Sequence, residues 1–190
     1  MNVFAALRDR RGNAVVEFAI LTPVLCAVFA GLFDVGNLVY TRERINDALN
    51  TAANYAIVQG AAATSTGGAQ LATDLARVAR GAGGTDWADV TVVVNNGPTA
   101  SNTSSGTTSG GTAANADSCY CPPRTAGNSS ASNATFSFGT AVACKSACTG
   151  GGSAGKFISI VVSHSFSPIW TGYGYVNNGT VTQSAEVQVQ

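Results

Sequence analysis

Charged side chains are scarce in this 190-residue sequence. Asp, Glu, Lys and Arg make up 11% of it, against roughly 25% in a typical soluble domain. Ten basic residues balance ten acidic ones, so no surplus of positive charge is available to neutralise a phosphate backbone, and we expect no nucleic-acid partner. A single Met and a single His leave little material for a transition-metal site. The 45% content of hydrophobic residues excludes acidic disorder.

Groups suited to catalysis are equally scarce. His164, the only His, would have to be the base for any Ser or Cys nucleophile, and no recognised motif surrounds it. Asp86 and Asp89 supply fewer than the about six to eight oxygen ligands that Ca²⁺ takes. Residues 151–156 (GGSAGK) lack the Ser or Thr that completes a phosphate-binding loop. We therefore expect no enzymatic activity, no cofactor, no metal site and no small-molecule substrate.

The N-terminal charges precede a long apolar segment. Three basic residues, Arg8, Arg10 and Arg11, stand before residues 18–33 (FAILTPVLCAVFAGLF), which carry no charge. Extended to residues 13–40, this segment is long enough to cross a hydrocarbon core of ~30 Å as a helix. The positive-inside rule places the N-terminus in the cytoplasm. We expect a retained membrane helix and not a cleaved secretory signal, because the apolar run is longer than a signal core and no A-x-A site follows it.

Glu17 lies in the N-terminal part of this apolar segment. A lone carboxylate is costly there unless it is paired or reaches the membrane interface. Two readings of Glu17 remain open. Its side chain either extends to the cytoplasmic headgroups, or it pairs with an α-amine at Asn13 of a neighbouring subunit, which cleavage after Gly12 would create.

Small or helix-disturbing residues recur every four positions along the same segment, at Ala19, Pro23, Ala27 and Gly31. This spacing places them along one face of a helix. Small faces allow membrane helices to approach closely, so the stripe is a candidate helix-packing surface. The alternative is that Ala and Gly are simply common in membrane helices, and the sequence does not decide between the two.

Residues 10–18 (RRGNAVVEF) resemble the recognition site of a class III prepilin peptidase, in which a basic leader ends in Gly and a Glu followed by an aromatic residue comes five positions later. Residues 17–60 are similar to the N-terminal segment of TadE-like proteins, which are pseudopilins of the tight-adherence (Tad/Flp) pilus system. The features that carry this resemblance are Glu17-Phe18, Pro23, the Phe33-Asp34 pair with Gly36, Tyr40, and Asn54-Tyr55-Ala56.

The resemblance implies a processing site at Gly12, Asn13, Glu17 and Phe18, with residues 1–12 as a basic leader that is removed. It implies a bacterial inner-membrane protein, and as partners a prepilin peptidase, other pseudopilins and the pilus assembly platform. The implied function is that of a minor pseudopilin in the assembly of a Tad/Flp-type pilus, an apparatus of adhesion, biofilm formation and secretion. The competing hypothesis is an unprocessed, single-pass adhesin or binding module with a disulfide-linked periplasmic domain.

The helical period continues beyond Tyr40 with no Gly or Pro until Gly60. We therefore predict one helix from about residue 13 to residue 59, whose first half, residues 13–40, lies in lipid and whose second half is the spine of an extracytoplasmic domain at residues 41–190. A second amphipathic helix is predicted over residues 69–80. Strands are predicted over residues 89–97, 134–143, 156–166 and 179–190.

Residues 97–118 consist almost entirely of Ser, Thr, Gly, Asn and Ala. Because this tract holds no large apolar side chain with which to build a core, we predict a flexible surface loop there. The predicted fold class is α+β and pilin-like. A long N-terminal helix, which is membrane anchor and then extracytoplasmic spine, packs on a small antiparallel sheet of about three or four strands.

Five cysteines are present. Cys26 lies in the apolar helix and is read as a small apolar residue. The other four, Cys119, Cys121, Cys144 and Cys148, are expected to form disulfides and not a zinc site, because C-x-C is too short for the common zinc knuckle and the expected compartment is oxidising. A bond within C-x-C would be strained. Two connectivities remain, Cys119–Cys144 with Cys121–Cys148, or Cys119–Cys148 with Cys121–Cys144.

Overall fold

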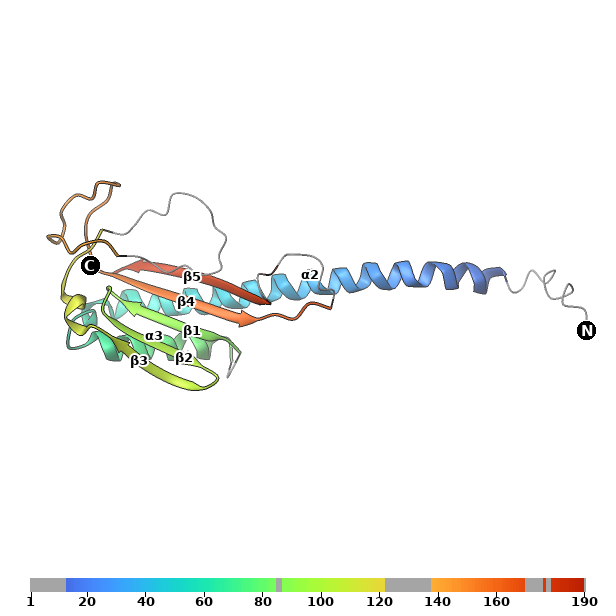
Figure 1. Ribbon diagram of the computed structural model, residues 1–190, viewed down its shortest axis with the longest axis horizontal. Helices are drawn as coiled ribbons and strands as arrows, with labels where there is room; N and C mark the ends of the chain where they lie inside the picture. Colours follow the sequence, from blue (N-terminus) through green and yellow to red (C-terminus); the bar gives the residue numbers. More distant parts are fainter. Residues whose placement is uncertain (1–12, 85–86, 122–137, 170–175, 177–178, 190) are drawn as a thin grey trace, which may run out of the picture.

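The computed structural model describes residues 13–84, 87–121, 138–169, 176 and 179–189. A long helix projects from a small α+β body, and the N-terminal end of this helix lies farthest from the body (Figure 1). The predicted fold class is confirmed. The helices are α2 (Asn13–Val58) and α3 (Gly68–Ala82), with short 3-10 turns η2 (Gly60–Ala62) and η3 (Ala113–Asp117). The strands are β1 (Asp89–Val94), β2 (Pro98–Thr103), β3 (Gly106–Gly111), β4 (Phe157–Ser165) and β5 (Thr180–Gln188).

Helix α2 is a single element of 46 residues, which corresponds to a length of about 69 Å. Its C-terminal half buries one stripe of side chains, among them Leu38, Ile45, Leu49 and Ala56. Their spacing of four or seven residues keeps them on one face of the helix. The predicted change from an apolar, unpacked first half to an amphipathic second half is therefore present within one uninterrupted helix.

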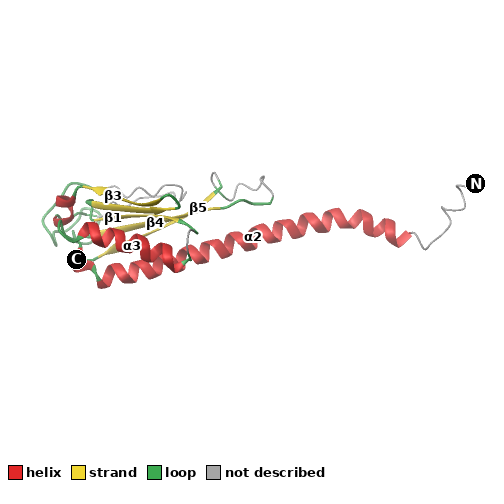
Figure 2. Ribbon diagram, turned by 90° about the horizontal axis from the view of Figure 1, so that it is seen from below, coloured by secondary structure: helices red, strands yellow, loops and turns green. Residues whose placement is uncertain are grey.

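The strands form one antiparallel sheet in the order β3-β2-β1-β4-β5. Both helices lie on the same face of this sheet (Figure 2), where α2 contacts β4 and β5 while α3 contacts β1 and β2. The core consists of β-branched side chains from the central strands and small or leucine side chains from the helices. Fully buried examples are Val92, Ile160 and Leu75. Alternation of buried and exposed residues along β1 is what a strand covered on one face requires.

The prediction of a flexible loop at residues 97–118 is wrong. This tract forms β2, β3 and η3, and it raises the sheet from the expected three or four strands to five. Backbone hydrogen bonds to β1 supply the order that its side chains cannot, and Ala100 and Ala116 are small enough to be buried in it. Asn95 and Asn96 have φ values of 48° and 55°, as the central residues of a type I′ hairpin turn do.

The end of this tract also holds the connection between α2 and α3. The carboxylate of Asp117 accepts a hydrogen bond of 2.9 Å from the backbone N–H of Ser65. Hydrogen bonds from the Ser65 side chain and backbone lower the pKa of Asp117. The buried Lys156 donates a hydrogen bond of 2.8 Å to the carbonyl of Ala63 in the same connection. Polar side chains therefore help to fix the connection between α2 and α3.

The other predicted elements are present with small shifts at their ends: α3, β1, β4 and β5 correspond to residues 69–80, 89–97, 156–166 and 179–190. The described part of the predicted strand at residues 134–143 does not form a strand. Residues 134–137 lie outside the described part of the chain, and residues 138–143 contribute only an isolated bridge between Val142 and Cys119.

Candidate functional site: the exposed helix and the end of the domain beside it

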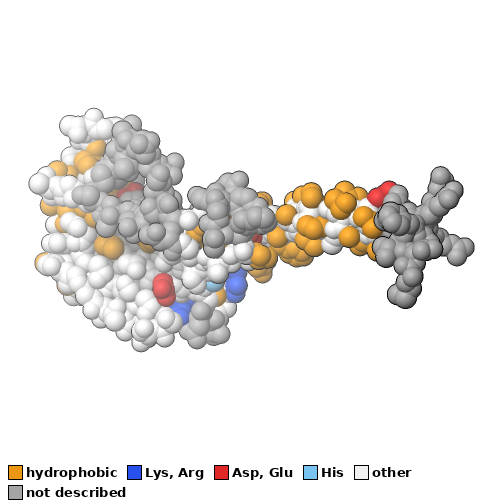
Figure 3. All heavy atoms as spheres, turned by 45° about the vertical axis from the view of Figure 1, so that its right-hand side comes forward, with side chains coloured by type: hydrophobic (Ala, Val, Ile, Leu, Met, Phe, Trp, Pro, Cys, Tyr) orange, Lys and Arg blue, Asp and Glu red, His pale blue; other side chains and the backbone are white. Residues whose placement is uncertain are grey.

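The N-terminal half of α2 is a rod of exposed apolar side chains, here called the rod and comprising residues 15–33. Its large hydrophobic side chains are between 46% and 71% exposed, and no residue of its most apolar 18-residue window is buried. Figure 3 shows these side chains covering the projecting helix. Within the described residues it is the one helix long and apolar enough to cross a membrane. A surface of this extent on a soluble protein would mark an interaction with a membrane or a partner.

The predicted processing residues lie at the free end of the rod. Gly12 is outside the described residues, and Asn13 is the first residue of α2. Glu17 and Phe18 lie one turn further along and are exposed, Phe18 at 66%. The helix therefore carries Glu17 at a distance of one helical turn from the position at which the predicted mature chain begins.

The predicted small-residue stripe lies on the rod and not in the body. Ala19 and Pro23 are exposed, whereas Ala27 and Gly31 are half-buried. The hydrophobic core of the described residues begins at Leu38 and includes none of the four. Pro23 is accommodated inside α2. The stripe is therefore not part of the hydrophobic core of the described residues, and its use against another helix stays a prediction.

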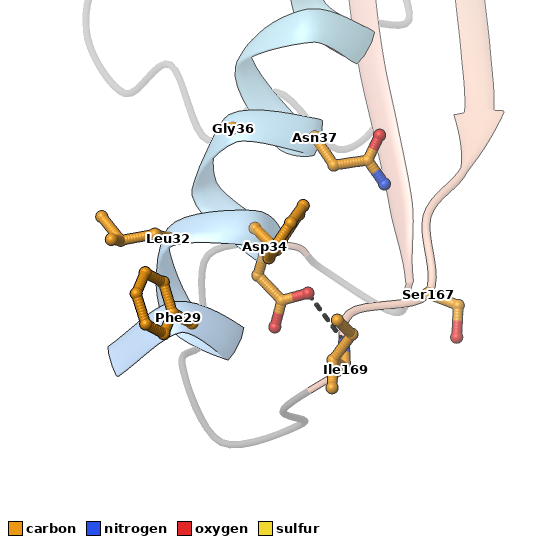
Figure 4. Close-up of a pocket in the computed structure, with 8 residues that line it drawn as sticks. Phe29, Leu32, Asp34, Gly36, Asn37, Ser167 and Ile169 are labelled. Atoms are coloured by element: carbon orange, nitrogen blue, oxygen red, sulfur yellow. Dashed lines mark hydrogen bonds between the residues drawn. The ribbon is translucent and has the colours of Figure 1, made fainter. Parts of the chain in front are cut away.

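Asp34 marks the point where the rod meets the body, and in the sequence it stands out only as part of the Phe33-Asp34 pair of the TadE-like resemblance. Its side chain is 8% exposed and accepts a hydrogen bond of 2.8 Å from the backbone N–H of Ile169. The two residues that this hydrogen bond joins both line an open groove of about 460 Å³, and Figure 4 shows the contact between them. The groove is lined by Phe29, Leu32, Phe33, Asp34, Gly36, Asn37, Ser167 and Ile169. The donor and acceptor residues of this hydrogen bond are 135 residues apart in sequence, so no local sequence pattern could have predicted the contact.

The four predicted disulfide cysteines are brought together at the opposite end of the body. Cys119 bonds Cys144 and Cys121 bonds Cys148, with Cα–Cα distances of 5.1 and 5.7 Å. The disulfide prediction is confirmed, in the first of its two connectivities. Residues 138–155, here called the disulfide lobe, lie at the end of the molecule farthest from the rod (Figure 1). Cys26 on the rod is an exposed free thiol.

His164, the candidate catalytic base, contacts Trp87. Its Nδ1 hydrogen-bonds the carbonyl of Trp87, and the two rings lie 5.8 Å apart. The guanidinium of Arg44 stacks 4.7 Å from the centre of the Trp87 ring and donates to the carbonyl of Gly83. This cluster joins α2, β4 and the connection between α3 and β1. In the part of the chain that the structure describes, no three His, Cys, Asp or Glu residues gather as a metal site would require.

Comparison with known proteins finds a family match over the segment that contains the rod. Residues 12–54 match the family model of the TadE-like protein, which confirms the sequence resemblance over that segment, less than a quarter of the chain. The match covers the rod and most of the spine of α2. No curated protein and no solved structure matches the chain.

Proposed function

We propose that this chain is a membrane-anchored minor pseudopilin that takes part in the assembly of a Tad/Flp-type pilus. The observation that carries the proposal is that the TadE-like match falls on a helix whose first half is exposed and apolar and whose second half is the spine of a folded domain. A structural subunit needs such an anchor and no catalytic centre. The family match supports a pilus-associated structural role over an enzymatic one.

In this proposal the rod crosses the bacterial inner membrane once. Arg8, Arg10 and Arg11 hold the N-terminus in the cytoplasm, and the α+β body lies on the periplasmic side. A prepilin peptidase removes residues 1–12, and the mature subunit associates with other pseudopilins and with the pilus assembly platform. The disulfides support this orientation, because they persist in an oxidising compartment such as the periplasm.

Processing gives the most direct test. We expect the intact mass of the chain from cells with the prepilin peptidase to correspond to a mature protein that begins at Asn13, and from peptidase-deficient cells to include residues 1–12. Gly12→Val in peptidase-containing cells is the matched control and should also retain the leader, because the added side chain prevents close approach to the backbone. A chain that keeps its leader in every strain would instead favour an unprocessed, membrane-anchored adhesin.

Substitution of Glu17 distinguishes the two interpretations of its role. If its carboxylate pairs with the new α-amine of a neighbouring subunit, Glu17→Gln should leave processing and membrane insertion intact but lower pilus output by about tenfold or more, since a charge pair within lipid is lost. Glu43→Gln, an exposed change on the same helix outside the rod, is the control and should have no effect. Normal pilus output from Glu17→Gln would leave the interfacial reading of this residue.

A further inference from the structure

The segment that follows β4 extends from the body along α2 toward the membrane anchor. Residues 166–169, here called the tip segment, lie beside α2 and reach it at the base of the rod (Figures 1 and 4). Phe166 is buried in the core, whereas Ile169 is 71% exposed. The tip segment therefore begins in the domain core and ends by presenting a large apolar side chain to its surroundings.

The backbone N–H at the end of the tip segment has a hydrogen-bond partner within the protein, as an apolar environment requires. The N–H of Ile169 donates to the carboxylate of Asp34 at 2.8 Å, and the Asp34 side chain is withdrawn from solvent beneath it. A backbone N–H without a partner costs several kcal/mol in hydrocarbon, so irregular backbone approaches lipid only when it is satisfied by protein. The contact with Asp34 meets that requirement.

The length of the rod places the membrane surface at the level of Asp34 and Ile169. Residues 15–33 measure about 28 Å as a helix, close to the ~30 Å thickness of a hydrocarbon core. Asp34 is the first carboxylate after them. Arg42, which is exposed, follows about 12 Å further along α2, at a depth where a cation meets phosphate headgroups.

We propose that Ile169, together with Phe29, Leu32 and Phe33, forms a membrane-contact surface that seats the periplasmic domain on the outer leaflet of the inner membrane. The occupant of the groove is the acyl-chain region of phospholipid, because three of its lining side chains also belong to the exposed apolar rod, and the groove is therefore continuous with the lipid-facing surface. The inference rests on the proposed membrane anchor and adds a second contact, which fixes the orientation of the domain on the bilayer.

The natural cysteines allow site-specific labelling of the full chain in phospholipid nanodiscs. Four of the five cysteines are paired in disulfides, and Cys26 is the one free thiol. A fluorophore is attached at Cys26 in the unaltered chain, at position 169 in Cys26→Ala/Ile169→Cys, and at position 58 in Cys26→Ala/Val58→Cys. Val58 is 77% exposed and lies about 36 Å beyond Asp34 along α2. Phospholipids that carry a quenching doxyl group near the headgroup or near the chain end report the depth of each label.

We expect the Cys26 label to be quenched most by the deep doxyl group, the position-169 label most by the shallow one, and the position-58 label by neither. The quenching at position 169 should exceed that at position 58 by about fivefold or more, since only an interfacial site lies within reach of the lipid chains. A position-169 label that behaves like position 58 while Cys26 is quenched would overturn the membrane-contact surface alone. An unquenched Cys26 label would overturn the anchor, and with it the proposed function.

A second copy of the chain is the other candidate occupant of the groove. It would show as disulfide cross-linking of the unlabelled Cys26→Ala/Ile169→Cys variant in nanodiscs that hold two chains, and as loss of lipid quenching of the position-169 label. That result would replace lipid by protein as the occupant and so contradict the proposal. Quenching without cross-linking supports it.

Discussion

Replacing Asn95 with Ala should lower the free energy of unfolding of the α+β body by about 3–5 kcal/mol, a larger effect than most single substitutions have. Asn95 is completely buried at the turn between β1 and β2. Its side-chain amide donates to the carbonyls of Ala116 at 2.9 Å and Ser118 at 2.5 Å, and its side-chain oxygen accepts from the N–H of Phe157 at 3.2 Å. Truncation leaves the carbonyl of Ala116 and the N–H of Phe157 buried without these hydrogen bonds, and the carbonyl of Ser118 partly buried without its own.

Asn96→Ala is the matched control for Asn95→Ala. Both residues have positive φ, of 48° and 55°, so both substitutions force Ala into the left-handed region at a cost of about 1–2 kcal/mol. Only Asn95 uses its side chain to join the turn to η3 and β4. Chemical denaturation of the two variants therefore isolates the side-chain hydrogen bonds as the difference between them. Equal losses of stability would show that the turn conformation, and not the buried amide, is what Asn95 contributes.

The long-range role of Asn95 also explains what the sequence could and could not predict. Elements with hydrophobic periodicity were predictable: α2 and α3 from apolar positions three and four apart, β1 and β4 from runs of β-branched residues, and β5 from the alternation of apolar and polar residues. Residues 98–117 lack this signal, because β2, β3 and η3 are ordered by backbone pairing and by hydrogen bonds from residues distant in sequence. The pair Asn95-Asn96 followed by Gly97 was the available sign of a hairpin turn.

The candidate site divides in the same way. The rod, with its exposed Glu17 and Phe18, follows from local sequence, since an unbroken apolar run is informative by itself. The groove does not follow, because it depends on a contact between Asp34 and Ile169. Disulfide connectivity lies between these cases. The spacing of the cysteines excluded one connectivity, whereas the choice between the remaining two required the geometry of the disulfide lobe.

Removal of both disulfides should unfold the disulfide lobe while the sheet stays folded. The lobe is held by backbone hydrogen bonds such as Lys145 N–H to Ala154 and Cys148 N–H to Gly152, and most of its side chains are exposed, so it buries little apolar surface. Cys119–Cys144 closes a loop of 25 residues, which in the chain-entropy model contributes about 3.5 kcal/mol. This contribution is large for a segment with so small a core, and we expect its loss to be decisive.

The two disulfides are not equivalent in this respect. Once Cys119–Cys144 is formed, Cys121–Cys148 closes a ring of only about six further residues, so its additional contribution falls to about 2 kcal/mol. Cys121→Ser/Cys148→Ser should therefore destabilise the lobe but leave it folded. The variant in which all four disulfide cysteines are replaced by Ser should have an unfolded lobe. Hydrogen exchange measures this directly. Amides in residues 142–154 should lose about 100-fold or more of their protection in the quadruple variant, since each 1.4 kcal/mol is a factor of ten.

Amides of β4 provide the internal control in the same experiment. Strand β4 pairs with β1 and β5 on its two sides and contributes the fully buried Ile158, Ile160 and Val162, so its protection comes from the hydrophobic core and not from the disulfides. It should exchange at the same rate in all variants. Loss of β4 protection together with the lobe would mean that the disulfides stabilise the whole domain through Tyr120, which is buried and pairs with Gly155 immediately before β4.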